Sequence, residues 1–329
     1  MIHLHGIGHF HPEVELTNAF LESLDIGTDD AWIVERVGIR TRRTVLPLDY
    51  IKHTRNADPR AASEAALYDN AKTGALAARM AMQRAGVSAE QIGMVISGGC
   101  CADNALPADA TRIAAELGIS APAFDVMAGC ASFGAHLHLV ASMRQDATDN
   151  FILLVQPENT TRVVDYRDRT SCVLWGDGTT AAVVSTRIPA RVRVDATLFA
   201  SDPAGWEKIR IPRHGHFHQD GRAVQGFAIR TTRDMVRNLQ AQSAAPSRMM
   251  FVGHQANLLM LEAVCRHAGI DPSRHFHNVA DHGNTGAAGA PSVLSQRWEL
   301  WRDGDEIAMA VVGAGLSWSA MRVTVGARA

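Results

Sequence analysis

The sequence predicts a layered α/β protein with helices on both faces of its sheets. Short apolar runs typical of strands alternate with longer helical segments along the chain. The alternation occurs in two similar halves, a pattern typical of layered α/β architecture. With 329 residues, the chain is also longer than one minimal domain at roughly 150 residues per domain. We therefore expect two α/β halves, 1–185 and 186–329, although no linker composition marks their boundary.

Composition and charge argue against several classes of partner. The hydrophobic fraction of 47% is ample for a large core, and 20% charged residues is ordinary for a soluble protein. A net charge of −2 gives no electrostatic basis for binding nucleic acid or an anionic membrane. Neither a signal peptide nor an apolar run long enough to span a membrane is apparent. Five cysteines without a CxxC pair indicate a reducing compartment, so we expect a cytoplasmic protein.

The first half is expected to begin with a capped helix and a basic turn within residues 26–43. Thr28 or Asp29 can act as the N-cap, and Gly38 stands where the helix should end. The stretch 44–70 is irregular and then Ala-rich, which indicates a loop with a short helix of its own. Further helices are expected at 71–86 and 107–117, and strands at 94–97, 124–126, 151–155 and 181–184.

The second half repeats the alternation of helix and strand, and the two halves are expected to meet near residues 186–200. No short repeat and no low-complexity segment interrupts the pattern. Helices are expected at about 228–243, 256–268 and 287–302, and strands at 249–252, 307–312 and 318–325.

The stretch 123–142, AFDVMAGCASFGAHLHLVAS, indicates a strand, a tight turn and a buried helix with Cys130 at its start. Unpaired N–H groups and the helix macrodipole at such a position favour the thiolate, which is the nucleophilic form of cysteine. Small neighbours such as Gly129 and Gly134 would let a substrate approach closely. On this stretch alone, a packed core cysteine is an equally good interpretation.

A nucleophilic cysteine needs a partner that handles charge or protons, usually histidine. His254 directly follows the apolar run 249–252, so it is expected at the carboxyl end of a strand, where open α/β folds place their sites. Asn284 lies in a Gly-flanked turn that opens another helix, where its amide would be a fixed hydrogen-bond donor. Each residue alone would be interpreted as structural. Together with Cys130 they favour a catalytic site.

The motifs AGCASFG, GHQAN and HGNTGAA occur in this order, accompanied by DDAWIVERVGIRTRR, WGDGTTAAVV and VVGAGLSWSAM. Over essentially the whole chain, they resemble the β-ketoacyl-acyl-carrier-protein synthase III family within the thiolase superfamily. The resemblance implies a thiolase-like fold, with two pseudo-duplicated α/β halves in five layers (α-β-α-β-α). It also implies a homodimer with its Cys, His and Asn at the end of a buried tunnel.

The resemblance further implies a role for each site residue. Cys130 would attack an acyl thioester, usually of coenzyme A, and retain the acyl group. His254 and Asn284 would donate hydrogen bonds to the thioester carbonyl of malonyl-acyl carrier protein and stabilise the enolate as CO2 leaves. The carbanion would then attack acyl-Cys130 and give a β-ketoacyl product. Backbone N–H groups of Cys130 and of Ala314 would form a second oxyanion hole.

Four residues match the family's access tunnel. Trp32 and Arg36 match a coenzyme-A clamp that stacks on adenine and contacts phosphate. Arg169 and Asn257 match further contacts to the nucleotide and the pantetheine arm. Besides the substrates acyl-CoA and malonyl-acyl carrier protein, neither a cofactor nor a metal is expected.

Three departures from the family pattern favour a specialised fatty-acid or polyketide-type pathway over fatty-acid initiation. Leu259 stands where the family often has a basic residue that helps dock the carrier or coenzyme. Leu106 stands where many members place an aromatic residue at the dimer interface, so a longer or bulkier acyl group would fit. The stretch 44–70 is longer than in housekeeping members, and we expect it to shape the acyl pocket or a partner surface.

Two other functions are compatible with the same resemblance. One is acyl transfer or thioester hydrolysis by the acyl-cysteine, which would not need Asn284 as an enolate stabiliser. The other is a non-catalytic, tunnel-shaping subunit of a heterodimeric synthase, which would be expected to have lost the Cys, His and Asn that this chain retains.

Other reactive side chains are expected to be structural. Cys100 and Cys101 follow a strand, and packing near the dimer interface is favoured over redox chemistry. Two sets of closely spaced histidines lack the accompanying motifs of a metal site, so exposed loops are favoured for His3, His5, His9, His11, His214, His216 and His218.

Overall fold

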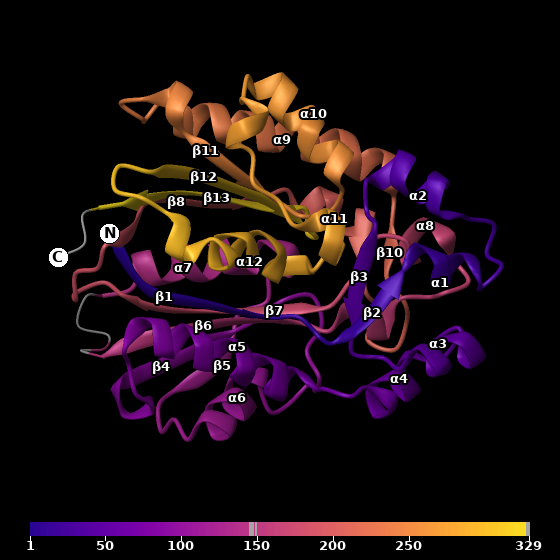
Figure 1. Cartoon of the computed structure of the whole chain (residues 1–329). Coiled ribbons are helices and arrows are strands. Elements are labelled where there is room, and N and C mark those ends of the chain that lie inside the picture. Colours follow the sequence, from indigo (N-terminus) through magenta and orange to yellow (C-terminus); the bar gives the residue numbers. More distant parts are fainter. Residues whose placement is uncertain (145–147, 149, 327–329) are drawn as a thin grey trace.

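The computed structural model describes residues 1–144, 148 and 150–326, and these form alternating layers of helix and strand (Figure 1). A hydrogen-bonded sheet of nine strands runs in the order β11-β12-β13-β8-β1-β7-β6-β4-β5. Strand β1 joins β8 through the pairs Ile2 with Val194 and Leu4 with Val192. Figure 1 shows β8 in an upper strand layer and β1 in a lower one. With helices between and outside the two strand layers, the predicted five-layer thiolase-like arrangement is confirmed.

The lower strand layer is the more buried of the two along its centre. All eight residues of β6 are buried, because α5 covers one face and α7 the other. A strand that is covered on both faces has a continuous apolar run rather than an alternating pattern, as in FILLV. The layer consists of β1 (Ile2–Phe10), β4 (Ile92–Ser97), β5 (Ala123–Asp125), β6 (Phe151–Glu158) and β7 (Gly178–Ser185).

The upper strand layer repeats the pairing pattern of the lower one. In the lower layer, β4 and β6 are parallel while β6–β7 and β7–β1 are antiparallel. In the upper layer, β11 and β12 are parallel while β12–β13 and β13–β8 are antiparallel. The proposed division between residues 185 and 186 falls in the connection between β7 and β8, and it stays a prediction. The upper layer consists of β8 (Val192–Ser201), β11 (Met250–Gly253), β12 (Glu306–Gly313) and β13 (Ser317–Val325).

Two helices, α7 (Ser132–Ser142) and α12 (Gly289–Gln296), lie between the strand layers. Small residues make this close packing possible. A Cβ atom on Gly134 would lie 2.2 Å from the Ser319 hydroxyl oxygen on β13. The outer faces are covered by α5 (Asn70–Ala85) and α6 (Asp109–Leu117) below, and by α9 (Gly221–Gln240) and α10 (Leu258–Ala268) above.

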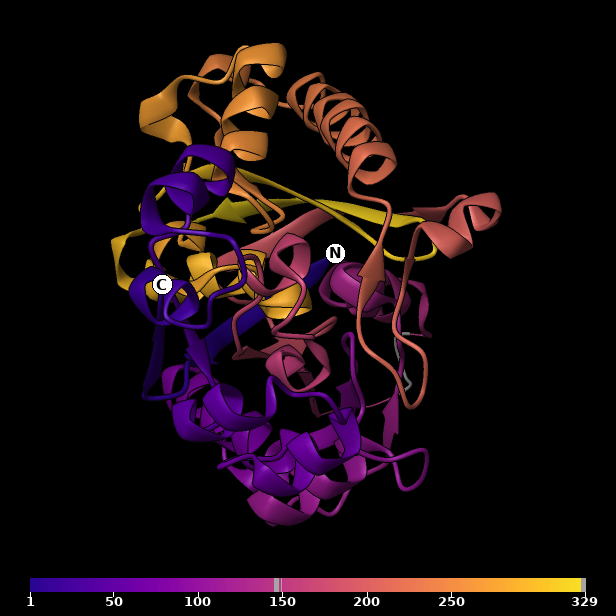
Figure 2. The ribbon, with the colours of Figure 1, turned by 90° about the vertical axis from the view of Figure 1, so that its right-hand side faces the viewer.

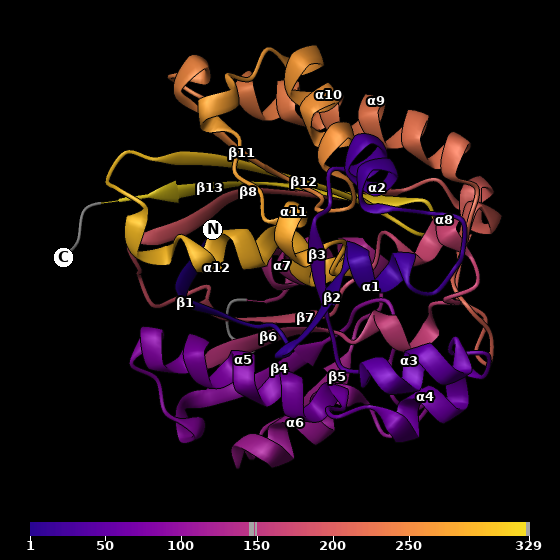
Figure 3. The same ribbon diagram turned by 45° about the vertical axis from the view of Figure 1, so that its right-hand side comes forward.

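The shorter elements gather at one end of the layers (Figures 1 and 3). In the view onto that end, α2 lies beneath α10, against which it packs (Figure 2). The short strands are β2 (Val14–Thr17), β3 (Thr41–Thr44), β9 (Ile209–Arg210) and β10 (His218–Gln219). The short helices are α1 (Asn18–Glu22), α2 (Asp30–Val37), α3 (Leu48–Thr54), α4 (Pro59–Ala65), α8 (Arg169–Cys172) and α11 (Val279–His282).

The expectation for residues 26–43 is half correct. Helix α2 begins after Asp29, whose carboxylate accepts the Trp32 N–H, and it ends at Gly38 in the left-handed region (φ 70°). The basic residues that follow do not form a turn, because Thr41–Thr44 is strand β3 and pairs with β2. The stretch 44–70 contains two helices, α3 and α4, rather than one.

Three further expectations are wrong. Helix α9 begins at Gly221 rather than near residue 228, because the Asp220 carboxylate caps it by accepting the Ala223 N–H. The helix expected at 287–302 is limited to α12, with short 3-10 turns on either side. Strands β1 and β8 were not predicted, and His3, His5 and His9 lie on β1 rather than in an exposed loop. Among the described residues, no group of three or more His, Cys, Asp or Glu side chains could hold a metal ion.

Within the part of the chain that the structure describes, no helix combines the length and the apolar character that crossing a bilayer would require.

Candidate active site

The turn that carries Cys130 is fixed by its own hydrogen bonds. Strand β5 leads into a 3-10 turn, Gly129–Ala131, and α7 begins directly after it. Gly129 adopts φ 54°, a left-handed conformation that glycine tolerates readily. The Ser132 hydroxyl donates to the Gly129 carbonyl (2.7 Å) and accepts the Ala128 N–H (3.0 Å). Cys130 is therefore held at the entrance to a buried helix, as the sequence predicts.

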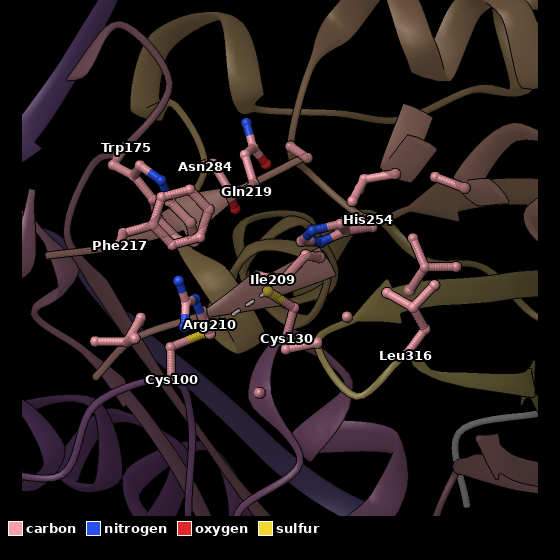
Figure 4. Close-up of a pocket in the computed structure, with 18 of the residues that line it drawn as sticks. Cys100, Cys130, Trp175, Ile209, Arg210, Phe217, Gln219, His254, Asn284 and Leu316 are labelled. Atoms are coloured by element: carbon pink, nitrogen blue, oxygen red, sulfur yellow. Dashed lines mark hydrogen bonds between the residues drawn. The ribbon is translucent and has the colours of Figure 1, made fainter. Parts of the chain in front are cut away.

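Cys130, His254 and Asn284 line one cavity of about 250 Å³ (Figure 4). Their exposed fractions are 8%, 5% and 6%, so bulk water barely reaches them. The same cavity is lined by Arg210 and Gln219, which are exposed at the surface, so it connects the site to solvent. The structure thus brings the three predicted residues together at the buried end of one passage.

The sheet topology explains this convergence. Open α/β folds place their sites at the carboxyl ends of parallel strands. In the lower layer, the parallel strands β4, β5 and β6 end beside Cys100, Cys130 and Glu158. In the upper layer, the parallel strands β11 and β12 end at His254 and at the turn that contains Ala314.

His254 is positioned by its backbone and leaves a ring nitrogen without a partner. Its N–H donates to the Ala310 carbonyl on β12 (3.0 Å), which fixes the residue at the end of β11. The Nδ1 atom is buried and has no hydrogen-bond partner among the described residues. Buried polar atoms are usually paired, so this unpaired nitrogen is an exception, and it belongs to a ring that lines the cavity.

Asn284 is anchored so that its amide group can donate. Its N–H donates to the Leu174 carbonyl (2.7 Å), and its side-chain Oδ1 accepts the Gly286 N–H (3.0 Å). The acceptor half of the amide is therefore occupied by the protein. The Nδ2 donor makes no hydrogen bond within residues 1–144, 148 and 150–326, and it remains available for a ligand.

Two charged or polar neighbours of Cys130 were missed in the sequence. The sulfur atoms of Cys100 and Cys130 are 3.7 Å apart. The Cys100 thiol, by donating a hydrogen bond, holds the pKa of Cys130 well below its usual range, and the His254 ring adds to this effect while burial opposes it. Cys100 itself keeps its proton, because its pKa is raised by the interaction with Cys130 and by burial. The contact with a second thiol thus favours the thiolate form of Cys130.

Glu158 is the other missed residue, and it ties two loops of the site together. Its carboxylate accepts the Cys100 N–H (3.0 Å) and the Ala287 N–H (2.7 Å). Burial, followed by the charge on Cys130, raises the pKa of Glu158 to about 8. An acidic residue at the end of an otherwise apolar strand was the signal that could have identified it.

The turn between β12 and β13 approaches the backbone of Cys130. A Cβ atom on Gly313 would lie 3.1 Å from the backbone nitrogens of both Cys130 and Ala131, so a larger residue there would crowd the Cys130 turn. Ala314 lines the cavity, and within the described part of the chain the N–H groups of Ala314 and Cys130 donate to no backbone carbonyl. Two unpaired N–H groups beside a nucleophile are the geometry of an oxyanion hole.

Three of the four predicted tunnel residues lie together outside this cavity. The guanidinium groups of Arg36 and Arg169 lie 4.7 Å and 4.9 Å from the centre of the Trp32 ring. Arg169 also donates to the Gly27 carbonyl. Asn257 is the N-cap of α10, with its Oδ1 accepting the Met260 N–H (3.1 Å), and it does not line the cavity.

Comparison with known proteins places this geometry in a family. Residues 124–203 match the family 3-oxoacyl-[acyl-carrier-protein (ACP)] synthase III, and residues 240–325 match the C-terminal domain of the same synthases. The chain belongs to the 3-oxoacyl-ACP synthase III family. It is therefore an acyl-transferring condensing enzyme of the ketosynthase type.

Individual relatives agree over almost the whole chain. The β-ketoacyl-ACP synthase III of Roseiflexus sp. is 31% identical over 95% of each chain. The crystal structure of the synthase III from Aquifex aeolicus superposes with a TM-score of 0.86 at 27% identity, covering 98% of this chain and 100% of that one. The priming β-ketosynthase of the R1128 polyketide pathway superposes with a TM-score of 0.81 at 25% identity, covering 99% and 96%.

Two of the three departures from the 3-oxoacyl-ACP synthase III pattern are single leucines, and both lie at the surface. Leu259, on α10, is 37% exposed, and Leu106 is 85% exposed in the loop before α6. Neither side chain is held in the core, so each is accessible to a partner. Their roles in docking and in acyl selection stay predictions.

Proposed function

We propose that this member of the family catalyses decarboxylative Claisen condensation through an acyl-Cys130 intermediate. The observation that carries the proposal is the meeting of a stabilised cysteine thiolate, an imidazole and a carboxamide donor at the buried end of one cavity. An acyl thioester of coenzyme A and malonyl-ACP are the proposed substrates.

In the loading step, the Cys130 thiolate attacks the carbonyl carbon of the acyl thioester. The developing oxyanion accepts hydrogen bonds from the N–H groups of Cys130 and Ala314, which donate to no backbone carbonyl among the described residues. The tetrahedral intermediate collapses by breaking the bond to the coenzyme thiolate, which then leaves. Donors that are fixed before the reaction stabilise the transition state without reorganisation.

In the condensation step, the malonyl thioester carbonyl lies between His254 and the Nδ2 group of Asn284. Loss of CO2 leaves an electron pair that is delocalised onto this carbonyl oxygen, where the two donors stabilise the enolate. The enolate carbon attacks the acyl-Cys130 carbonyl, a carbon–carbon bond forms, and the Cys130 thiolate is released. Acyl transfer or hydrolysis would not require the anchored Asn284 donor, which favours condensation.

The surroundings of the site support a specialised substrate. Helix α4, within the stretch 44–70, lines a second cavity of about 610 Å³ that shares Cys100 and Ile211 with the active-site cavity. This stretch is therefore placed where it can limit the acyl group beyond the nucleophile. The likeness to a polyketide priming ketosynthase agrees with such a role.

A homodimer and a coenzyme-A clamp complete the proposal. Strand β5 is the last strand of its layer, and Phe124 and Met127 beside it are exposed, which suits pairing with a second copy. Trp32, flanked by two guanidinium groups, can stack on adenine while these groups contact phosphate. Size measurement by light scattering tests the first point.

Intact-mass analysis of single-site variants tests the mechanism. Wild type incubated with a panel of acyl-CoAs should gain one acyl group, and Cys130→Ala should gain none. His254→Ala and Asn284→Ala should load but should neither release CO2 nor form product from malonyl-ACP. An acyl adduct on Cys130→Ala would overturn the proposal, and loaded wild type that only hydrolyses would favour the thioesterase alternative.

A further inference from the structure

Cys100 lies beside the nucleophile, and the proposed mechanism assigns its sulfur atom no covalent step. It follows β4, packs against Cys130 with a sulfur–sulfur distance of 3.7 Å, and points toward it within the same cavity (Figure 4). The sequence favoured packing near a dimer interface for this residue. The structure shows that Cys100 is also a direct neighbour of Cys130, in a position suited to covalent chemistry.

Both sulfur atoms are held by rigid parts of the site. The Cys100 N–H is fixed by both oxygens of the buried Glu158 carboxylate, at 3.0 Å and 3.1 Å. The Cys130 turn is fixed by the two hydrogen bonds of Ser132. A disulfide bond is about 2.05 Å long, so the two sulfur atoms must approach by roughly 1.6 Å.

The contact between the two sulfur atoms also makes the two thiols unequal. The hydrogen bond from Cys100, opposed by burial, lowers the pKa of Cys130, and the same contact together with burial raises the pKa of Cys100. A thiolate is the species that attacks peroxide, and a nearby thiol is what resolves the product. Substrates reach Cys130 through the cavity, and a molecule as small as a hydroperoxide can follow the same route.

We propose that Cys100 and Cys130 form a reversible intramolecular disulfide when the enzyme meets a hydroperoxide. The Cys130 thiolate attacks a peroxide oxygen, the O–O bond breaks, and hydroxide leaves, giving a sulfenic acid on Cys130. The Cys100 sulfur then attacks the sulfenic sulfur, the S–O bond breaks, and water leaves with the Cys100 proton. The Cys130 thiolate and the Cys100 thiol lose two electrons in total, and hydrogen peroxide is reduced to one water and one hydroxide, which takes a proton from the solvent to give a second water. A dithiol reductant reverses the reaction by thiol–disulfide exchange.

This disulfide would switch off acyl loading and protect the nucleophile. A sulfur atom that is held in a disulfide cannot attack a thioester, so condensation stops. Without a second thiol, a cysteine sulfenic acid proceeds to sulfinic and sulfonic acids, which are not restored by thiols. The proposal rests on the proposed reactivity of Cys130, but it requires neither malonyl-ACP nor condensation.

The test compares wild type with Cys100→Ser after treatment of the full chain with hydrogen peroxide. Free thiols are blocked with N-ethylmaleimide under denaturing conditions, and peptides are mapped by mass spectrometry. Wild type should lose two hydrogen atoms and yield a peptide pair linked through Cys100 and Cys130. Its acyl loading should be lost on oxidation and recovered with dithiothreitol. Cys100→Ser should gain two or three oxygen atoms on Cys130 and recover about tenfold less loading than wild type.

Cys101→Ser is the matched control, because Cys101 is the adjacent cysteine and lines the second cavity but not the first. It should form the disulfide and recover as wild type does. A linked peptide that joins Cys101 to Cys130 would overturn the assignment. The proposal would also be overturned if the wild type formed no linked peptide and lost acyl loading as irreversibly as Cys100→Ser. Because the peptide map needs no acyl substrate, these outcomes are independent of whether the enzyme condenses malonyl-ACP.

Discussion

Replacing Asn284 with aspartate tests its proposed donor role almost without changing the shape of the side chain. One carboxylate oxygen can still accept the Gly286 N–H, which lies 3.0 Å from Oδ1 in the wild type. The turn that presents the side chain therefore keeps its anchor. What changes is the group that faces the cavity, because a negatively charged acceptor replaces the Nδ2 donor.

The expected loss follows from the number of donors removed. One fixed oxyanion donor contributes about 3 kcal/mol, or about 10²- to 10³-fold in rate. Asn284→Ala should therefore slow condensation by about that factor. Asn284→Asp should slow it further, since a carboxylate that is 6% exposed at this position would repel the enolate in a medium with little screening. Loading of Cys130 should change by no more than about threefold, because it uses backbone donors.

The assay separates the two steps. Each variant is first loaded with an acyl-CoA and followed by intact mass, and the isolated acyl-enzyme is then mixed with malonyl-ACP in a single turnover. Product and CO2 are measured over time. The reasoning is wrong if Asn284→Asp condenses within tenfold of wild type, or if its loading falls as much as its condensation.

Three other substitutions test separate parts of the structure. Burial raises the pKa of Glu158 to about 8 from 4.5, so the folded protein retains a proton that the unfolded chain loses. The free energy of unfolding should therefore fall as the pH rises from 4.5 to 8, and Glu158→Gln should remove up to about 5 kcal/mol of this fall. Urea unfolding at pH 5 and 8.5 measures the effect, and a pH dependence that the substitution leaves unchanged would contradict it. Gly313→Ala places a methyl group 3.1 Å from the Cys130 nitrogen, so acyl loading of Cys130 should slow at least about tenfold. Loading at the wild-type rate would show that the methyl group does not crowd the Cys130 turn. Trp32→Ala should raise the KM for acyl-CoA about tenfold by removing the stacking surface beside Arg36, while preloaded enzyme condenses normally; an unchanged KM would place coenzyme A elsewhere.

Local signals identified the parts of the fold that depend on neighbouring residues. Helix α2 was predicted from a side chain that caps its first turn and a glycine that ends it, and both act within a few residues. The turn before Cys130 was predicted for the same reason, because small residues there leave few other conformations. The resemblance to the synthase family then supplied the five layers and the distant partners of the cysteine.

Features that depend on pairing across the chain were not predictable in this way. Strand β1 has alternating histidines and looks polar, and it becomes a central strand because β7 and β8 pair with its two edges. Cys100 and Cys130 meet because β4 and β5 are adjacent and parallel, so that their carboxyl ends coincide. The residues around Cys100 contain no pattern that predicts which strand β4 will pair with.

The middle layer contains α7 and α12, which are far apart in the chain, so the order of synthesis determines when the site residues can meet. Cys130, in the turn just before α7, leaves the ribosome long before His254, Asn284 and the glycine turn at the end of β12 exist. Until β13 is made and seated, Gly134 has no strand to pack against, and the thiolate has neither imidazole nor carboxamide beside it. A nascent or prematurely terminated chain thus carries Cys130 and Cys100 without His254, Asn284 or the glycine turn, and these groups meet only when the last strands are in place.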